Sequence, residues 1–250
     1  MTSRVYALAN QKGGVGKTTT AINMAACVAE AGTPVLLIDL DPQANATTGL
    51  GFRPDELGLS TYDLLHGTSL EDVVIDTSVP NLWLAPSHPD LAAAQVELDQ
   101  GDTLLRDILH GTGERWPYVF VDCPPSLGLL TVNALSAANR LIVPVQCEYY
   151  ALEGLAQLLQ SVELVRTRLN PRLGVTGVLL TMYDARTRLA SDVASEVRSH
   201  FGPLVFDTVV PRSIRLAEAP SHGVPITAYD SSSAGADAYY RAALEVVERG

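Results

Sequence analysis

The chain has 250 residues, of which 47% are hydrophobic and 18% are charged, a composition that excludes an intrinsically disordered protein. No apolar run approaches the roughly 18 residues of a membrane span, and three widely spaced cysteines exclude a disulfide framework and predict a reducing cytoplasm. The formal net charge of −11 argues against general nucleic-acid affinity, yet residues 166–215 carry eight Arg against four acidic side chains, a local net of +4.

Short apolar runs alternate with helical patterns along the chain. The runs are continuous, which indicates parallel strands buried on both faces. The predicted strands are Val5–Ala9, Val35–Ile38, Tyr118–Val121, Leu141–Val145, Val175–Leu180 and Leu204–Phe206. The predicted helices are Thr18–Ala31, Leu127–Ala138, Leu152–Leu169, Arg188–His200 and Ala234–Glu248.

These repeated units predict the α/β class, with a doubly wound, mostly parallel sheet. Residues 50–115, rich in Gly and Pro, are expected to form short helices packed on one edge of it. No linker interrupts the pattern, so residues 1–250 are expected to form a single domain. The first strand begins at residue 4 or 5, and we therefore expect no N-terminal helix-turn-helix domain and no sequence-specific repressor.

A glycine-rich loop separates the first strand from the first helix. It reads Lys12-Gly13-Gly14-Val15-Gly16-Lys17-Thr18-Thr19. Glycines allow backbone N–H groups to surround a phosphate, and the helix N-terminus adds partial positive charge. Lys17 is expected to reach the β- and γ-phosphates, and the Thr18 hydroxyl to ligate Mg²⁺. The standard P-loop pattern is not met, because the position five residues before Gly16 is Gln11.

The two lysines of this loop, Lys12 and Lys17, are the only lysines in a chain with fifteen arginines. This composition indicates that a compact ammonium group is needed at both positions. Two other strands end in acidic residues, at the edge where ligands bind in open α/β sheets. Asp41 follows the strand that ends near Asp39 and is free to reach the phosphates. Asp122 directly follows an apolar run, a pattern typical of an acid that acts on Mg²⁺ through a bound water or the Thr18 ligand shell.

Together these motifs resemble the ParA/Soj/MinD group of deviant-Walker ATPases. The resemblance rests on the Lys12–Thr19 loop and on Asp39-Leu-Asp41-Pro-Gln-Ala-Asn and Asp122-Cys-Pro-Pro-Ser. Two further stretches, Leu180-Thr-Met-Tyr-Asp-Ala-Arg-Thr187 and Pro211-Arg-Ser-Ile-Arg-Leu-Ala-Glu-Ala-Pro-Ser221, point to the ParA/Soj chromosome-segregation branch. The resemblance spans nearly the whole chain.

The resemblance implies a role for individual residues. Lys12 matches the lysine that reaches across an ATP-sandwiched homodimer to the nucleotide phosphates of the partner. Asp41 matches the residue that orients the attacking water, and Asp122 matches the Walker B acid. Pro211 and Arg212 lie where the family holds adenine, followed by Ser213 where the family often has Asn. The remaining pair, Arg186 and Arg215, matches positions that bind DNA without sequence preference.

The implied function is an ATP-dependent partitioning ATPase, with ATP and Mg²⁺ as cofactors. Its implied partners are a second copy of itself, double-stranded DNA and a ParB/Spo0J-like protein that stimulates hydrolysis, and it is expected on the nucleoid without a membrane. A MinD-like ATPase is disfavoured because the last helix, with two Arg against two Glu after Tyr239, is not a basic amphipathic anchor. Another cargo-positioning ATPase that uses the same cycle stays open. A metallocluster ATPase of the same fold is disfavoured by the spacing of Cys123 and Cys147.

Overall fold

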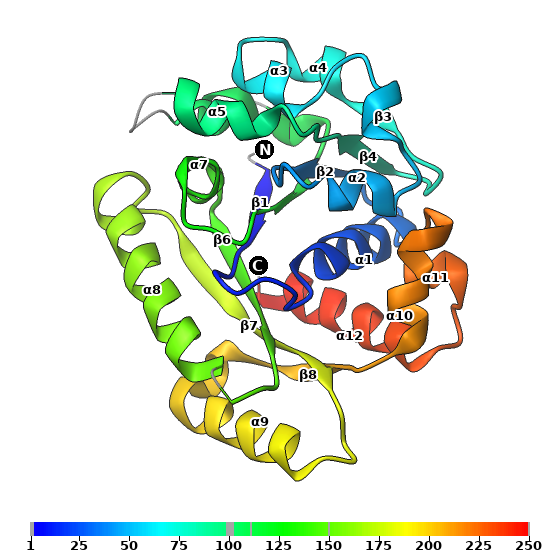
Figure 1. The fold of residues 1–250 in the computed structure, drawn as a ribbon, viewed down its shortest axis with the longest axis vertical. Coiled ribbons are helices and arrows are strands. Elements are labelled where there is room, and N and C mark those ends of the chain that lie inside the picture. The colour runs from blue at the N-terminus through cyan, green and yellow to red at the C-terminus, as the bar shows by residue number, and fades with distance from the viewer. Residues whose placement is uncertain (1–2, 99–102, 111, 150, 250) are drawn as a thin grey trace.

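The computed structural model describes residues 3–98, 103–110, 112–149 and 151–249. In this part of the chain, eight strands form one sheet in the order β3-β4-β2-β5-β1-β6-β7-β8, with helices on both faces (Figure 1). Neighbouring strands are parallel except for the antiparallel pair β3 and β4 at one edge. The predicted fold class is thereby confirmed.

The strands are β1 (Arg4–Leu8), β2 (Val35–Asp39), β3 (Ile75–Asp76), β4 (Leu82–Ala85), β5 (Tyr118–Asp122), β6 (Arg140–Gln146), β7 (Gly174–Tyr183) and β8 (Val205–Pro211). The first helices are α1 (Lys17–Glu30), α2 (Asn45–Gly49), α3 (Thr61–Leu65), α4 (Leu70–Val73), α5 (Leu91–Glu97) and α6 (Leu104–Leu109). The later helices are α7 (Leu129–Ala137), α8 (Ala151–Arg168), α9 (Arg188–Phe201), α10 (Ile214–Glu218), α11 (Ile226–Tyr229) and α12 (Ala234–Arg249). None of the described helices is long and apolar enough to cross a membrane.

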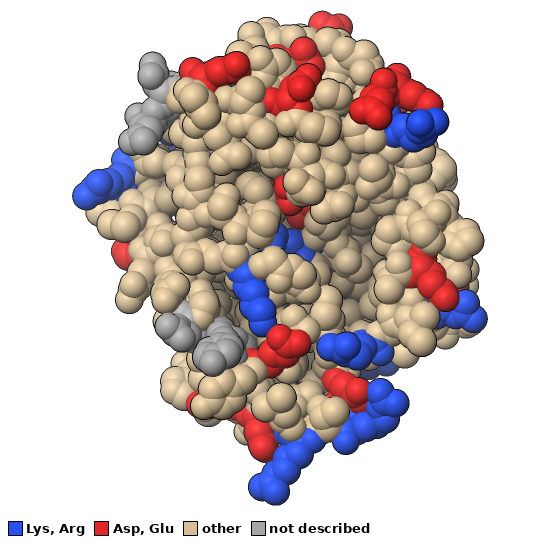
Figure 2. Space-filling view, in the orientation of Figure 1, with Lys and Arg blue, Asp and Glu red and all other residues tan. Residues whose placement is uncertain are grey.

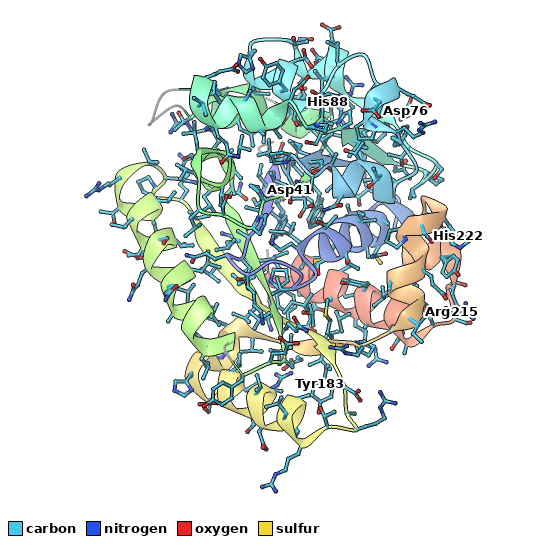
Figure 3. The ribbon with its side chains drawn as sticks, in the orientation of Figure 1. Asp41, Asp76, His88, Tyr183, Arg215 and His222 are labelled. Atoms are coloured by element: carbon cyan, nitrogen blue, oxygen red, sulfur yellow. The ribbon has the colours of Figure 1, made fainter. Side chains whose placement is uncertain are left out.

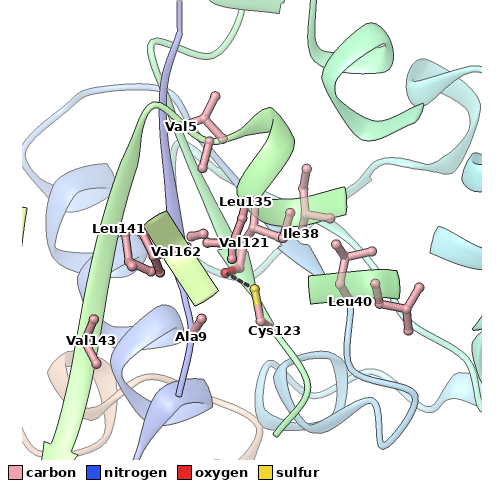
Figure 4. Close-up of a cluster of buried hydrophobic side chains, with 14 of the residues drawn as sticks. Val5, Ala9, Ile38, Leu40, Val121, Cys123, Leu135, Leu141, Val143 and Val162 are labelled. Carbon is pink, nitrogen blue, oxygen red and sulfur yellow. Dashed lines mark hydrogen bonds between the residues drawn. The ribbon is translucent and has the colours of Figure 1, made fainter. Parts of the chain in front are cut away.

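Alternate side chains of each strand enter two cores, one on each face of the sheet. In β1, Val5 and Ala7 pack on the face covered by α5 to α9, whereas Tyr6 and Leu8 pack against α1 and α12. Figure 4 shows part of the first core, where strand and helix residues interdigitate. Strands that bury both faces read as continuous apolar runs, and for this reason β1, β2, β5, β6 and β7 could be predicted from the sequence. β8 extends beyond the predicted Leu204–Phe206, because its second half contains the exposed Asp207 and partly exposed residues and does not form an apolar run.

The segment 50–115 differs from its prediction. It does contain short helices, α3 to α6, but it also adds β3 and β4 to the sheet. β4 is only four residues long and lies between Asn81, whose φ is 63°, and Pro86. Its apolar run is too short for the residue pattern to distinguish a strand from a loop. The segment becomes a strand because it pairs in parallel with β2.

Candidate functional site

The carboxyl ends of the central parallel strands form one edge of the sheet, and a cavity of about 420 Å³ opens there. Four chain segments line most of it: the glycine-rich loop with the start of α1, the loop after β2 with α2, the turn after β5, and the end of β7. Their lining residues are Gly13, Gly14, Gly16, Lys17, Thr18, Thr19, Asp41, Gln43, Asn45, Thr48, Pro125 and Met182. Figure 2 shows basic and acidic side chains close together near the middle of this face.

The glycine-rich loop (residues 12–16) is held in place by β6 and β7, which lie on the same side of β1. Asn10 donates from Nδ2 to the Pro144 carbonyl at 2.7 Å and accepts the Lys12 N–H at 3.0 Å. The Thr181 hydroxyl donates to the Val15 carbonyl at 2.8 Å. Gly16 has a φ of 85°, in the left-handed region that favours glycine, and α1 begins at the next residue. The loop therefore presents its N–H groups and the N-terminus of α1 to the cavity.

The two lysines differ in their surroundings. Lys17 is 6% exposed, and burial lowers its pKa against the opposing charges of Asp122 and Asp41. The Lys17 Nζ donates a hydrogen bond to the Lys12 carbonyl at 3.3 Å, and this acceptor partly compensates the buried positive charge of the ammonium group. Lys12 lies at the cavity rim, and its Nζ forms an ion pair with Glu148 Oε2 at 2.9 Å between half-exposed side chains. Pairs this exposed contribute only about 0–1 kcal/mol.

The two acids at the end of β2, Asp39 and Asp41, are both buried but differ in what they contact. Asp39 is fully buried and accepts hydrogen bonds from the Thr47 N–H, the Thr47 hydroxyl and the Asp41 N–H at 2.8, 2.8 and 3.1 Å. Burial raises the pKa of Asp39 to about 6, opposed by these hydrogen bonds. Asp39 thus shapes the loop, whereas Asp41 lines the cavity. The Asp41 carboxylate accepts the Gln43 N–H at 3.0 Å, and its carbonyl accepts the Ser87 hydroxyl at 2.8 Å.

Asp122 ends β5 beside Asp39, with which it shares a register position. It is fully buried, and neither carboxylate oxygen has a hydrogen-bond partner. Burial and the neighbouring charge of Asp39 raise its pKa well above the usual range, and the nearby Thr18 hydroxyl and the Lys17 ammonium oppose this effect. A buried carboxylate without partners requires a compensating cation or donor. This orphaned group and the Thr18 hydroxyl on the cavity wall fit a hydrated Mg²⁺, which takes oxygen ligands and keeps several waters.

A second cavity of about 240 Å³ adjoins the first and shares Gly16, Thr19 and Met182 with it. Its other wall is the segment after β8, which we call the base strap (residues 210–213). Val210, Pro211, Arg212 and Ser213 all line it, and the Arg212 N–H donates to the Tyr183 carbonyl at 2.9 Å. A largely apolar slot next to a phosphate-binding loop suits a flat nucleobase. Most sequence-predicted residues of the loop and the strap thus line two adjoining cavities, whereas Lys12 and the buried Val15 line neither.

Arg186 and Arg215 lie outside both cavities. Arg186, 86% exposed, follows β7 and donates from Nε and Nη2 to Asp184 at 2.8 and 2.7 Å. Arg215, half-exposed on α10, contacts Glu218 at 3.1 Å and Asp230 at 3.6 Å. Figure 3 labels Arg215 on α10 and Tyr183 near the end of β7, three residues before Arg186. Both guanidinium groups are therefore surface charges with a local carboxylate partner.

Several residues of the site could not be predicted from the sequence. Glu148 holds Lys12, Thr181 holds the glycine-rich loop, and Met182 lies between the two cavities. One signal pointed to them: Glu148 and Thr181 lie at or just after the carboxyl ends of β6 and β7, the edge at which open α/β sheets bind ligands. That signal indicates the carboxyl-end edge of the sheet as a whole and does not identify which side chains there contact a ligand.

Comparison with known proteins gives one consistent result. A sequence family described as an AAA domain matches residues 3–175. The chromosome-partitioning ATPase Soj of Thermus thermophilus is 54% identical over 98% of this chain and 96% of its own length. The chromosome partitioning protein ParA of Caulobacter vibrioides is 50% identical over 98% and 94% of the two chains.

Among solved structures, cobyrinic acid a,c-diamide synthase from Mycobacterium smegmatis, with bound ADP and magnesium, superimposes with a TM-score of 0.85. It is 37% identical and covers 96% of this chain and 92% of its own.

Proposed function

The chain belongs to the ParA/Soj family of partitioning ATPases, and we propose that it cycles between an ADP-bound or free protomer and an ATP-bound homodimer that binds DNA without sequence preference. A ParB-like partner would stimulate hydrolysis and release the dimer from the nucleoid. One observation carries the proposal: the glycine-rich loop and Asp41 line a single cavity, and the charges of Asp41 and of the buried Asp122 both act on Lys17 there. The higher identity to partitioning ATPases than to the diamide synthase supports segregation as the role.

ATP binding follows from the two adjoining cavities. The N–H groups of residues 13–19 and the Lys17 ammonium would hold the phosphates, and Pro211 and Arg212 would hold adenine mainly through the backbone of the base strap. Thr18 would ligate Mg²⁺, with Asp122 on its water shell. The metal neutralises charge that develops on the β- and γ-phosphates.

Hydrolysis needs a water held in line with the γ-phosphate, and Asp41 is placed for this task. Its carboxylate lines the phosphate cavity and is only 6% exposed. The loop that carries Asp41 is fixed by three hydrogen bonds: the Gln43 N–H donates to the Asp41 carboxylate, the Asp41 N–H donates to Asp39, and the Ser87 hydroxyl donates to the Asp41 carbonyl. Because the loop is already fixed, less entropy is lost when the carboxylate positions a water. Asp41 therefore acts on the water, while Lys17 acts on the nucleotide.

Dimerisation depends on Lys12 in this proposal. In the single chain its ammonium is held by Glu148 at the cavity rim. Because both side chains are half-exposed, the pair is weak enough to be exchanged for the multiply charged phosphates of a nucleotide on the facing protomer. Bound ATP would thus supply the attraction that joins two chains which each carry a net charge of −11.

DNA binding would use the one segment whose charge opposes that of the chain. Arg186 and Arg215 are exposed, and a dimer presents two copies of each. Contacts between guanidinium groups and phosphates carry no sequence information. The affinity for DNA that they provide increases with the number of positive charges that contact the DNA at once. Dimerisation on ATP would therefore raise DNA affinity without any change in the DNA-binding side chains.

The test compares ATP with ADP in the Asp41→Ala protein, which is expected to retain ATP. Binding to labelled duplexes of unrelated sequence should be strong with ATP and Mg²⁺ and weak with ADP. If DNA binds equally in both nucleotides, or not at all while the ATP dimer forms, the DNA-segregation function is wrong. The latter result would favour the alternative, an ATPase that positions another cargo by the same cycle.

A further inference from the structure

The carboxyl end of β7 adopts a backbone conformation that is rare for a residue with a long side chain. Met182 has a φ of 50°, in the left-handed region; among the described non-glycine residues, Ala44 and Asn81 share a positive φ. Such a conformation persists only where the surroundings fix it, and it is often found where a ligand binds. The position of Met182 at the nucleotide cleft therefore calls for a functional explanation.

Both neighbours of Met182 are tied to parts of the cleft. The Thr181 hydroxyl holds the Val15 carbonyl of the glycine-rich loop at 2.8 Å, and the Tyr183 carbonyl accepts the Arg212 N–H of the base strap at 2.9 Å. Pairing between β7 and β8 is irregular between Leu180 and Tyr183, so the strand is bent at this point. Residues 181–183 thus join the loop that would hold phosphate to the strap that would hold the base.

Met182 is one of the residues at the junction of the two cavities and lines both. Gly16 and Thr19 are the other residues common to the two cavities, and Met182 has the longest side chain of the three. A thioether carries no charge to offer a phosphate, but it is flexible and polarisable and makes favourable contacts with aromatic rings. Its chemistry therefore suits the nucleoside half of the ligand.

We propose that Met182 is a nucleotide-positioning residue whose side chain supports the ribose and base of ATP, held in its left-handed conformation by the contacts of Thr181 and Tyr183. This inference rests on the proposed ATP binding and names a residue for the nucleoside. It predicts that removal of the side chain weakens binding of the nucleoside but not binding of the phosphates.

The experiment measures, by calorimetry, the affinity of the whole chain for ATP and for inorganic tripolyphosphate, which occupies the phosphate cavity alone. Met182→Ala should weaken ATP binding roughly tenfold, the effect of losing contact with about two methylene-sized groups. Tripolyphosphate affinity should stay within about twofold of the parent, since the glycine-rich loop is unchanged. Met182→Leu, which keeps an apolar side chain of similar volume, should bind ATP nearly as well as the parent.

Asn81→Ala is the matched control, because Asn81 also has a left-handed φ but lies outside both cavities. It should bind both ligands like the parent. If Met182→Ala does not fold, Met182→Gly, which also relieves the backbone strain, takes its place in the comparison.

Equal weakening of ATP and tripolyphosphate would overturn the inference, because Met182 would then act through the glycine-rich loop. Unchanged ATP affinity would overturn it as well. Failure of the unmodified chain to bind either ligand would instead refute the proposed function itself, so the two failures are distinguishable.

Discussion

The salt dependence of DNA binding gives the most quantitative test of the charged surface. Each phosphate contact contributes roughly 0.9 to the slope of log K against log salt. A dimer in which both copies of Arg186 and Arg215 contact phosphate therefore owes about 3.6 of its slope to these four side chains. The double substitution Arg186→Ala, Arg215→Ala should flatten the slope by about 3 to 4.

The local ion pairs refine this expectation. The Arg186 side chain makes two hydrogen bonds to Asp184, so in the proposed complex its guanidinium would exchange a carboxylate for a DNA phosphate. Asp184→Asn should consequently strengthen DNA binding, because a neutral amide competes less for the cation and repels phosphate less.

The assay is fluorescence anisotropy of a labelled duplex over a salt series, with the Asp41→Ala protein and ATP. Arg241→Ala is the control, since Arg241 is an exposed arginine paired with Asp237 on α12, and it should leave the slope unchanged. An unchanged slope in the double variant, with the dimer intact, would refute the assignment of these arginines to DNA.

Three further predictions concern catalysis, packing and ionisation. Asp41→Ala should lower ATP turnover at least about 100-fold while nucleotide affinity persists, whereas Lys17→Ala should lose binding itself; calorimetry combined with phosphate release separates the two. Gly177→Ala should destabilise the fold by about 1–3 kcal/mol in denaturant titrations, because its Cβ would lie 2.6 Å from a Phe206 ring carbon and 2.7 Å from the Leu204 carbonyl oxygen. Its control Gly154→Ala, on α8 with open space around the new Cβ, should be neutral or stabilising. Hydrogen bonds from Arg186 lower the pKa of Asp184 to about 2, so the pair's contribution to stability is present at neutral pH and is lost as the pH falls toward 2. In Arg186→Ala an NMR titration should find that pKa raised toward the ordinary value of about 3.9, while the retained Arg186 N–H bond keeps it somewhat below; an unchanged pKa would contradict the side-chain contact.

The sequence predicts most of the fold because most long strands are apolar on both faces and three of the long helices, α1, α8 and α9, end within three residues of a Gly or Pro. Val35–Ile38 and Tyr118–Val121 illustrate this, since each matches an observed strand to within one residue. β4 could not be predicted in the same way, because four residues between turns become a strand only through pairing with β2. Local pattern determines the long elements, and tertiary pairing determines the short ones.

The candidate site shows a similar division. The spacing of Lys12, Lys17 and Thr18 within one loop predicts a phosphate-binding loop, since its chemistry is local to that loop. The sequence does not reveal that Lys12 contacts Glu148, 136 residues away, or that Met182 has a left-handed backbone. Those features arise where separate strand ends meet, and a residue pattern along one segment does not encode them.

In the proposed cycle, hydrolysis, DNA binding and release all depend on ATP-dependent dimerisation. Light scattering of the Asp41→Ala protein should give a mass near 26.7 kDa with ADP and about twice that with ATP and Mg²⁺. Adding Lys12→Ala should hold the mass near 26.7 kDa with ATP while nucleotide binding persists. A single-chain mass for Asp41→Ala with saturating ATP, or a normal dimer without the Lys12 ammonium, would contradict the account.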